Sequence, residues 1–137
     1  MVQLQKRSVW LMLLFSFVTH GIYVPFWFSN RKDSFNSLNS HEKISSIPIV
    51  ALLIASIISA ISDIFHIRPV GFMATPAEMQ INIIYALLNG FIAVIILIQS
   101  FKIRRILNMH YDIELSAVAT FFFTIFYLQY KINRLDK

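Results

Sequence analysis

The chain of 137 residues contains no cysteine, and it has only three glycines and four prolines. The absence of cysteine excludes disulfide bonds, thiolate metal ligands and cysteine nucleophiles. So few glycines argue against a phosphate-binding loop, and neither a nucleophile elbow nor an H-E-x-x-H zinc motif occurs. We therefore expect no cofactor, no metal site and no enzymatic activity.

Charged residues are also few, at 14% of the chain, whereas 57% of the residues are hydrophobic and 13 are phenylalanine. This apolar content exceeds that of an ordinary soluble domain. The twelve Lys and Arg residues give a net charge of +5, but they are scattered beside apolar segments. This distribution is typical of anchoring to lipid headgroups, and we expect no binding to nucleic acid.

The apolar residues form four segments separated by polar joints: Val9 to Phe28, Ile47 to Phe65, Ile81 to Phe101 and Ala117 to Tyr130. A bilayer core of about 30 Å requires about 20 helical residues, which the first three segments provide and the short last one does not. Lipid forces each segment to satisfy its own backbone hydrogen bonds, and none alternates with the period of a strand. The sequence predicts an all-α integral membrane protein, with residues 1–137 as a single membrane-embedded helical domain.

The first segment contains Thr19, Gly21 and Pro25, and glycine and proline weaken or bend a helix. This segment is either one kinked span from Trp10 to Trp27 or a re-entrant hairpin that turns near Thr19 to Gly21. The polar stretch that follows, Asn30 to Lys43, suits a short helix on the headgroup surface. We expect no functional site in that stretch.

The distribution of positive charge distinguishes these topologies, because Lys and Arg favour the cytoplasmic side of short loops. If all four segments cross the bilayer, six basic residues lie on each side. If the first is a hairpin and the last crosses, the division is eight against four. If only the second and third cross, eleven share one side and Arg68 is alone on the other. We favour the hairpin, in a multi-pass protein of the inner membrane.

Local signals mark where the two central helices begin. Ser45 precedes a proline at position 48, and serine caps helices while proline is tolerated in the first turn. Thr75-Pro76-Ala77-Glu78 has the pattern of a capping box. Basic residues after Phe101 predict that the third helix continues beyond the lipid as an amphipathic extension.

Small residues recur every four positions in the second segment, at Ala51, Ala55 and Ser59, and the third segment contains the pair Ala86 and Gly90. Such stripes let helix backbones approach closely, which is a main source of helix association in lipid. We expect these two faces to pack against each other.

Four residues in or beside the apolar segments are candidates for an intramembrane polar site: His20, Asp63, His66 and Asn89. An ionisable group costs about 3 kcal/mol at the centre of a span, so each such group is a candidate by default. Asp63 and His66 share a helical face, where they form either a proton relay or an interfacial ion pair beside Arg68. Asn89 suits an interhelical hydrogen bond. His20 either donates to a carbonyl left free at the hairpin turn or has a ligand or proton role.

Several motifs distributed along nearly the whole chain resemble one known family. They are Arg7-Ser8-Val9, Thr19-x-Gly21-Ile22-Tyr23-x-Pro25-x-Trp27-Phe28, Arg31-Lys32, Asn36-x-Leu38, Lys43 and Tyr127-Leu128-Gln129-Tyr130-Lys131-Ile132-Asn133. This pattern resembles a family of small prokaryotic membrane proteins known only as a domain of unknown function. His20 departs from it, at a position where an apolar residue is expected. The resemblance implies a bacterial inner-membrane protein and implies no reaction, ligand or catalytic residue.

Two functions from different classes fit these observations. The first is a non-catalytic accessory or scaffold subunit that packs against a larger membrane partner, or against another copy, through its small-residue and phenylalanine faces. The second is a small oligomeric transporter or proton-conducting element that uses His20, Asp63, His66 and Asn89. We favour the first, because it requires no special residue.

Overall fold

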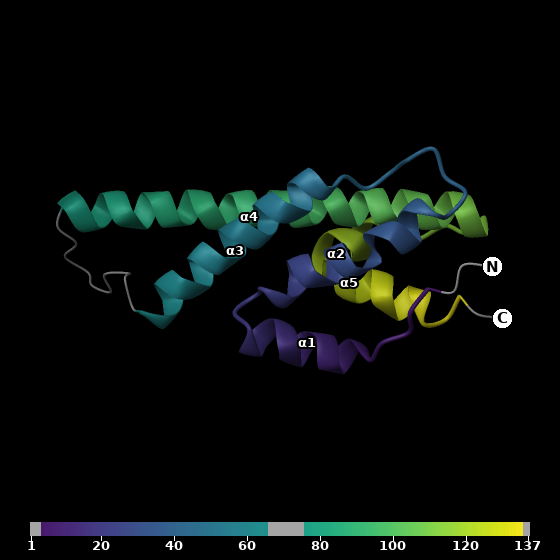
Figure 1. The fold of residues 1–137 in the computed structure, drawn as a ribbon, viewed down its shortest axis with the longest axis horizontal. Helices are drawn as coiled ribbons and strands as arrows, with labels where there is room; N and C mark the ends of the chain where they lie inside the picture. The colour runs from purple at the N-terminus through teal and green to yellow at the C-terminus, as the bar shows by residue number, and fades with distance from the viewer. Residues whose placement is uncertain (1–3, 66–75, 136–137) are drawn as a thin grey trace.

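The computed structural model describes residues 4–65 and 76–135, and within these ranges the chain forms five helices and no strand. The prediction of an all-α fold is confirmed. Figure 1 shows the helices, which are α1 (Val9–Val18), α2 (Tyr23–Asn36), α3 (Ser46–Ile64), α4 (Pro76–Tyr111) and α5 (Ala117–Ile132).

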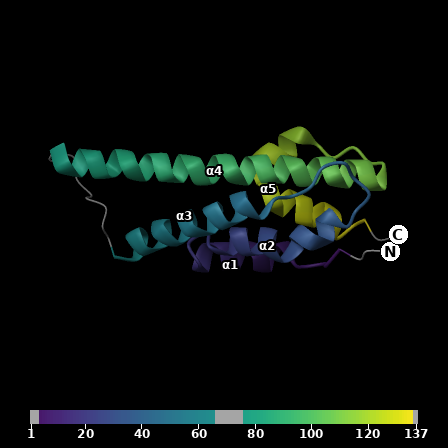
Figure 2. The same ribbon diagram turned by 45° about the horizontal axis from the view of Figure 1, so that its top comes forward.

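The long helix α4 organises the molecule. Its 36 residues extend over about 54 Å at a rise of 1.5 Å per residue. α3 runs beside it, and α1, α2 and α5 gather around its C-terminal half, as both views show (Figures 1 and 2). The two ends of the described chain lie close together at this same end of the molecule. The N-terminal half of α4 and the end of α3 therefore project from a helical cluster.

The first apolar segment is a helical hairpin, not one kinked helix. Between α1 and α2 the chain reverses, and His20 and Gly21 take positive φ angles of 49° and 88°. Glycine adopts such angles without the steric cost that other residues pay. Thr19 Oγ1 accepts a hydrogen bond of 3.0 Å from the amide of Tyr23, and the rings of Phe15 and Tyr23 stack across the turn with centroids 5.7 Å apart. The turn lies where the sequence predicted it.

The expectation of a separate surface helix after this segment is wrong. α2 continues without a break to Asn36, and the side chains of Arg31 and Phe35 are only 3% and 0% exposed. Trp27, Arg31 and Phe35 recur every four residues, so they share one face of the helix, and that face is buried. Arg31 is therefore a charged residue on the buried face, whereas Lys32 and Asp33 lie on other faces of α2.

Among the described residues, two helices are long and apolar enough to cross a membrane: α3 and the part of α4 from Met79 to Tyr111. Only 33% and 11% of the residues in their most apolar windows are buried inside the protein, so most of this apolar surface lies on the outside. The core helix of a soluble protein would be buried instead. This exposure indicates association with a membrane.

The helix boundaries follow the local signals. Ser45 Oγ accepts a hydrogen bond from the amide of Ile47 at the start of α3. α4 begins at Pro76, although Thr75 of the predicted capping box lies outside the described residues. α4 also continues past Phe101 to Tyr111, which confirms the predicted extension.

The last helix is short and bent. Thr124 in the middle of α5 has φ of 41° and ψ of −120°, so the helix consists of two halves that differ in direction. The second half turns Ile125, Leu128 and Ile132 into the core, where each is almost completely buried. α5 therefore packs against α4 as a short, bent helix.

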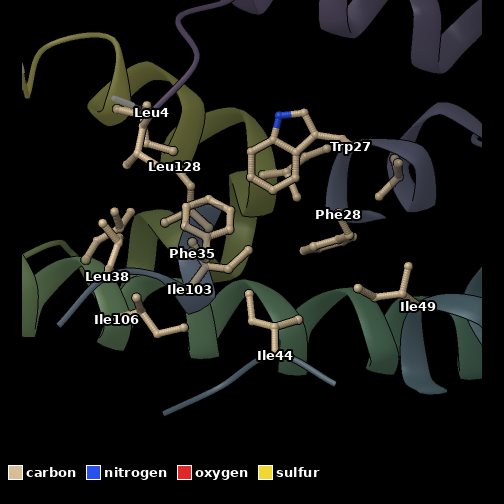
Figure 3. Packing of buried hydrophobic residues seen from close by; sticks show 14 of the residues in the cluster. Leu4, Trp27, Phe28, Phe35, Leu38, Ile44, Ile49, Ile103, Ile106 and Leu128 are labelled. Atoms are coloured by element: carbon tan, nitrogen blue, oxygen red, sulfur yellow. The ribbon is translucent and has the colours of Figure 1, made fainter. Parts of the chain in front are cut away.

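The core lies where α2, α4 and α5 meet. Phe28 and Phe35 of α2 face Ile103 and Ile106 of α4 and Leu128 of α5 (Figure 3). All five side chains are fully buried. Aromatic side chains of this size bury the largest apolar area per residue, so they contribute most to the stability of the cluster.

We expect Phe28→Ala to lower the free energy of unfolding by about 3–5 kcal/mol, because it leaves a cavity in this core. Phe26→Ala is the matched control, since Phe26 lies on the same helix and is 51% exposed, against 0% for Phe28. Thermal unfolding of the purified protein in detergent measures the difference. Equal losses in the two variants would show that α2 does not pack as described.

Candidate functional site

The polar side chains of the sequence motifs converge where the two ends of the chain meet. Trp27 Nε1 donates to Gln129 Oε1 over 3.1 Å, and Gln129 Nε2 donates to the carbonyl oxygen of Gln5 and to Asn133 Oδ1 over 3.2 and 2.7 Å. Asn133 Nδ2 donates to the carbonyl oxygen of Arg7 over 2.7 Å, and its Oδ1 accepts from the amide of Arg7 over 3.1 Å. We call this set of residues the terminal network.

The terminal network fixes three separate parts of the chain to one another. Trp27 belongs to α2, Gln129 belongs to α5, and Gln5 and Arg7 belong to the segment before α1. Gln129 is fully buried, and a buried amide without partners costs about 1–3 kcal/mol. Because every polar atom of this amide is paired here, the network stabilises one arrangement of the three parts over the alternatives.

Arg31 lies beside this network. Its Nη2 donates to the carbonyl oxygen of Gln5 over 2.7 Å, and its guanidinium carbon lies 5.0 Å from the centre of the Trp27 ring. Its Nη1 is buried without a hydrogen-bond partner. Burial, and to a smaller extent the positive charge of Arg7, lower the pKa of Arg31 from its usual value to about 10, while Tyr23 opposes the shift. Arg31 is therefore a buried cation that no carboxylate of residues 4–65 and 76–135 neutralises.

The other polar motif residues hold the linker between α2 and α3. Asn36 forms two hydrogen bonds with the main chain of Ile44, over 3.0 Å as donor and 2.7 Å as acceptor. Lys43 Nζ donates to the carbonyl oxygen of Asn36 over 2.6 Å, and Lys32 Nζ donates to Ser46 Oγ over 2.8 Å. Asn36, Lys43 and Lys32 thus make structural contacts.

Of the four candidates for an intramembrane polar site, the structure brings two together. Tyr85 of α4 donates to the carbonyl oxygen of Ser59 over 2.6 Å and to Asp63 Oδ1 over 3.2 Å. Asn89 Oδ1 accepts from Ser59 Oγ over 3.2 Å. Asp63 and Asn89 therefore belong to one polar cluster between α3 and α4. We call Ser59, Asp63, Tyr85 and Asn89 the interhelical cluster.

The other two candidates are not part of this cluster. His20 is exposed on the turn between α1 and α2, and its side chain makes no hydrogen bond within the part of the chain that the structure describes. His66 lies outside the described residues. The proposed pairing of Asp63 with His66 therefore stays a prediction.

The predicted packing of the small-residue faces holds for one helix only. Ala55 and Ser59 of α3 are buried and Ala51 is half-buried, but Ala86 and Gly90 of α4 are exposed. A Cβ atom added at Gly90 would meet no atom within 4 Å. α4 instead presents Tyr85 and Asn89 to α3, because these side chains form the hydrogen bonds. The prediction that the two small-residue faces pack against each other is therefore wrong.

Sequence reasoning missed the roles of Arg31, Tyr85 and Gln129. Arg31 follows Trp27 by four residues, so a helical reading would have placed both on one face. Tyr85 precedes Asn89 by four residues in the same way. Gln129 offered no local signal, because its partners come from the other end of the chain.

Within residues 4–65 and 76–135, no three His, Asp or Glu side chains lie close enough together to hold a metal ion. The polar side chains described above donate to or accept from the backbone or one another, as structural residues do.

We expect Trp27→Phe to lower the free energy of unfolding by about 1–3 kcal/mol, because it removes the donor to the buried Gln129 Oε1 while keeping an aromatic ring. Trp10→Phe is the control, since Trp10 is 81% exposed, and its effect should stay within about 0.5 kcal/mol. Both values come from thermal unfolding in detergent. A loss no larger for Trp27→Phe than for Trp10→Phe would show that the network is not formed.

Comparison with known proteins identifies the family and no relative of known function. No curated protein and no solved structure matches the chain. The family described as Domain of unknown function (DUF4234) matches residues 7–135, a range that includes all the motifs described above. The chain therefore belongs to this family.

Proposed function

We propose that this protein is a non-catalytic accessory or scaffold subunit of the inner membrane, which packs against a larger membrane partner through α4. The observation that carries this proposal is the exposure of Ala86 and Gly90 on a helix whose α3-facing side is already occupied. Small residues on a span gain little from lipid, but they let another helix approach closely.

One face of α4 binds α3, and another face is left uncovered. Tyr85 and Asn89 hold α3 through the interhelical cluster. Ala86 directly follows Tyr85, and Gly90 directly follows Asn89. Each small residue therefore lies about 100° around the helix from the polar residue before it. Phe91 and Val94 extend the uncovered apolar surface on the same half of the helix. A partner helix can therefore dock on α4 without displacing α3.

The topology that best supports this role has two spans, α3 and α4, with the α1–α2 hairpin re-entrant. Asn39 in the linker after α2 donates its amide to His110 Nδ1 at the end of α4, and Arg105 Nε lies 2.8 Å from Glu42 Oε1. This linker, the end of α4 and both chain ends thus share one end of the molecule (Figure 1). The grouping matches the charge division of eleven against one, which favours a cytoplasmic location for that end.

A proton-conducting or transport element is the alternative, and the interhelical cluster is the observation that favours it. A carboxylate, a phenol and an amide joined between two spans resemble a proton relay in composition. Asp63, however, lies at the end of α3, where headgroups and water reach it, and His20 is not part of the cluster. We therefore rank transport second.

We expect Asp63→Asn and Asn89→Leu to leave proton flux across reconstituted vesicles unchanged, because a scaffold conducts nothing. His20→Ala serves as a further comparison outside the cluster. A flux that is present in the unchanged protein and lost in Asp63→Asn, with the variant still inserted, would support transport and contradict the scaffold.

We expect Gly90→Leu to abolish association with the partner while leaving the fold intact, because a Cβ at this position meets no atom of the chain itself. Ile81→Phe is the control, since Ile81 is also exposed but lies about 180° around the same helix from Gly90. Crosslinking in native membranes, followed by gel analysis of the adducts, measures association. The same adducts in Gly90→Leu as in the unchanged protein would rule out docking on this face.

A further inference from the structure

A groove of about 270 Å³ lies between the segment before α1 and the α1–α2 hairpin. It is lined by Arg7, Ser8, Leu11, Met12, Phe15 and Tyr23. One end of this lining is cationic and polar, and the rest is aliphatic or aromatic. Such a division suits an amphiphile that has a charged head and an apolar tail.

The Arg7 guanidinium at the polar end of the groove lacks a counter-ion, and so does the guanidinium of Arg31, which lies near Arg7 but does not line the groove. The Arg7 side chain is exposed and makes no ion pair or hydrogen bond within the described part of the chain. Arg31 is 3% exposed, and its Nη1 has no partner. The Gln5 carbonyl that binds Arg31 is two residues before Arg7, so the two cations are neighbours. Buried or adjacent cations are stabilised by an anion, and no carboxylate of the described chain provides one.

The first turn of α1 adds a third feature that favours an anion. The N-cap residue Ser8 makes no side-chain capping hydrogen bond, and the first turn contains no acidic residue. The amides of the first turn, at residues 9–11, have no carbonyl partner within a helix, because helical hydrogen bonds begin at Met12. These amides and the helix dipole favour negative charge at the position where Arg7 and Ser8 line the groove.

The apolar wall belongs to a helix that faces lipid. α1 exposes Trp10, Leu14 and Phe17, three large apolar side chains that water would solvate poorly. The groove therefore opens beside the acyl chains of the bilayer, with Arg7 and Ser8 at the level of the headgroups. A lipid reaches such a site from the membrane itself.

We propose that this groove binds an anionic phospholipid. Its phosphate lies against Arg7, Ser8 and the first-turn amides of α1, and one acyl chain runs along Leu11, Met12 and Phe15. The site is separate from the docking face of α4. Its occupancy does not depend on the proposed scaffold role.

Native mass spectrometry of the detergent-solubilised protein tests the proposal, with phosphatidylglycerol or phosphatidylcholine of identical acyl chains added in mixed micelles. We expect phosphatidylglycerol to bind about tenfold more tightly than phosphatidylcholine, and Arg7→Gln to remove that preference. The variant keeps its fold, because the terminal network uses only the main chain of Arg7. Lys102→Gln is the charge-matched control away from the groove, and it should change the affinity less than about twofold.

Three results would overturn the proposal. Equal affinity for the two lipids would show that no anionic headgroup is recognised. An equal loss in Arg7→Gln and Lys102→Gln would show a response to total charge and not to the groove. Displacement of phosphatidylglycerol by millimolar inorganic phosphate would show a site for free phosphate, in which the apolar wall has no role.

Discussion

The buried hydrogen bond from Trp27 to Gln129 joins residues 102 positions apart in the chain, and the cluster around it depends on this connection. Through Gln129 and Asn133 the same network binds the segment before α1, so the two chain ends are held together. The Trp27–Gln129 hydrogen bond is itself buried and is therefore shielded from competing water. The first apolar segment is thereby held beside α5 as a hairpin.

The hairpin and α5 pack on the C-terminal half of α4. The N-terminal half contacts α3, and the rest of its surface is uncovered. α3 is attached to it through the interhelical cluster, in which Asp63 and Asn89 accept hydrogen bonds from Tyr85 and Ser59. The remaining surface of α4 is apolar and contains Ala86 and Gly90. The fold thus combines a closed cluster, which needs no partner, with an open helix that can accept one.

Local sequence signals predicted the structural features that depend on residues close together in the chain. Ser45 and Pro76 mark the starts of α3 and α4, and Gly21 marks the turn of the hairpin because a residue there needs a positive φ. Features that depend on distant residues were not predictable in this way. The bend at Thr124 lies in a helix that contains no glycine or proline. The buried Arg31 donates to the carbonyl oxygen of Gln5, which precedes α1 in the chain.

The same distinction applies to the candidate site residues. Small-residue spacing correctly placed Ala55 and Ser59 in a contact, but it could not tell which face of α4 would meet them. The hydrogen bonds of Tyr85 and Asn89 decided that orientation, because a polar group in a span gains more from a partner than a small residue gains from close packing.

The topology of the first segment tests the account most directly. Because the chain contains no cysteine, single cysteines at Gln5, Ser37 and Met73 can be labelled with a membrane-impermeant maleimide in right-side-out vesicles. The account requires Gln5 and Ser37 to be protected together and Met73 to label, with all three labelling after permeabilisation. Labelling of Ser37 on the side opposite to Gln5 would show that the first segment crosses the bilayer, and it would contradict the hairpin.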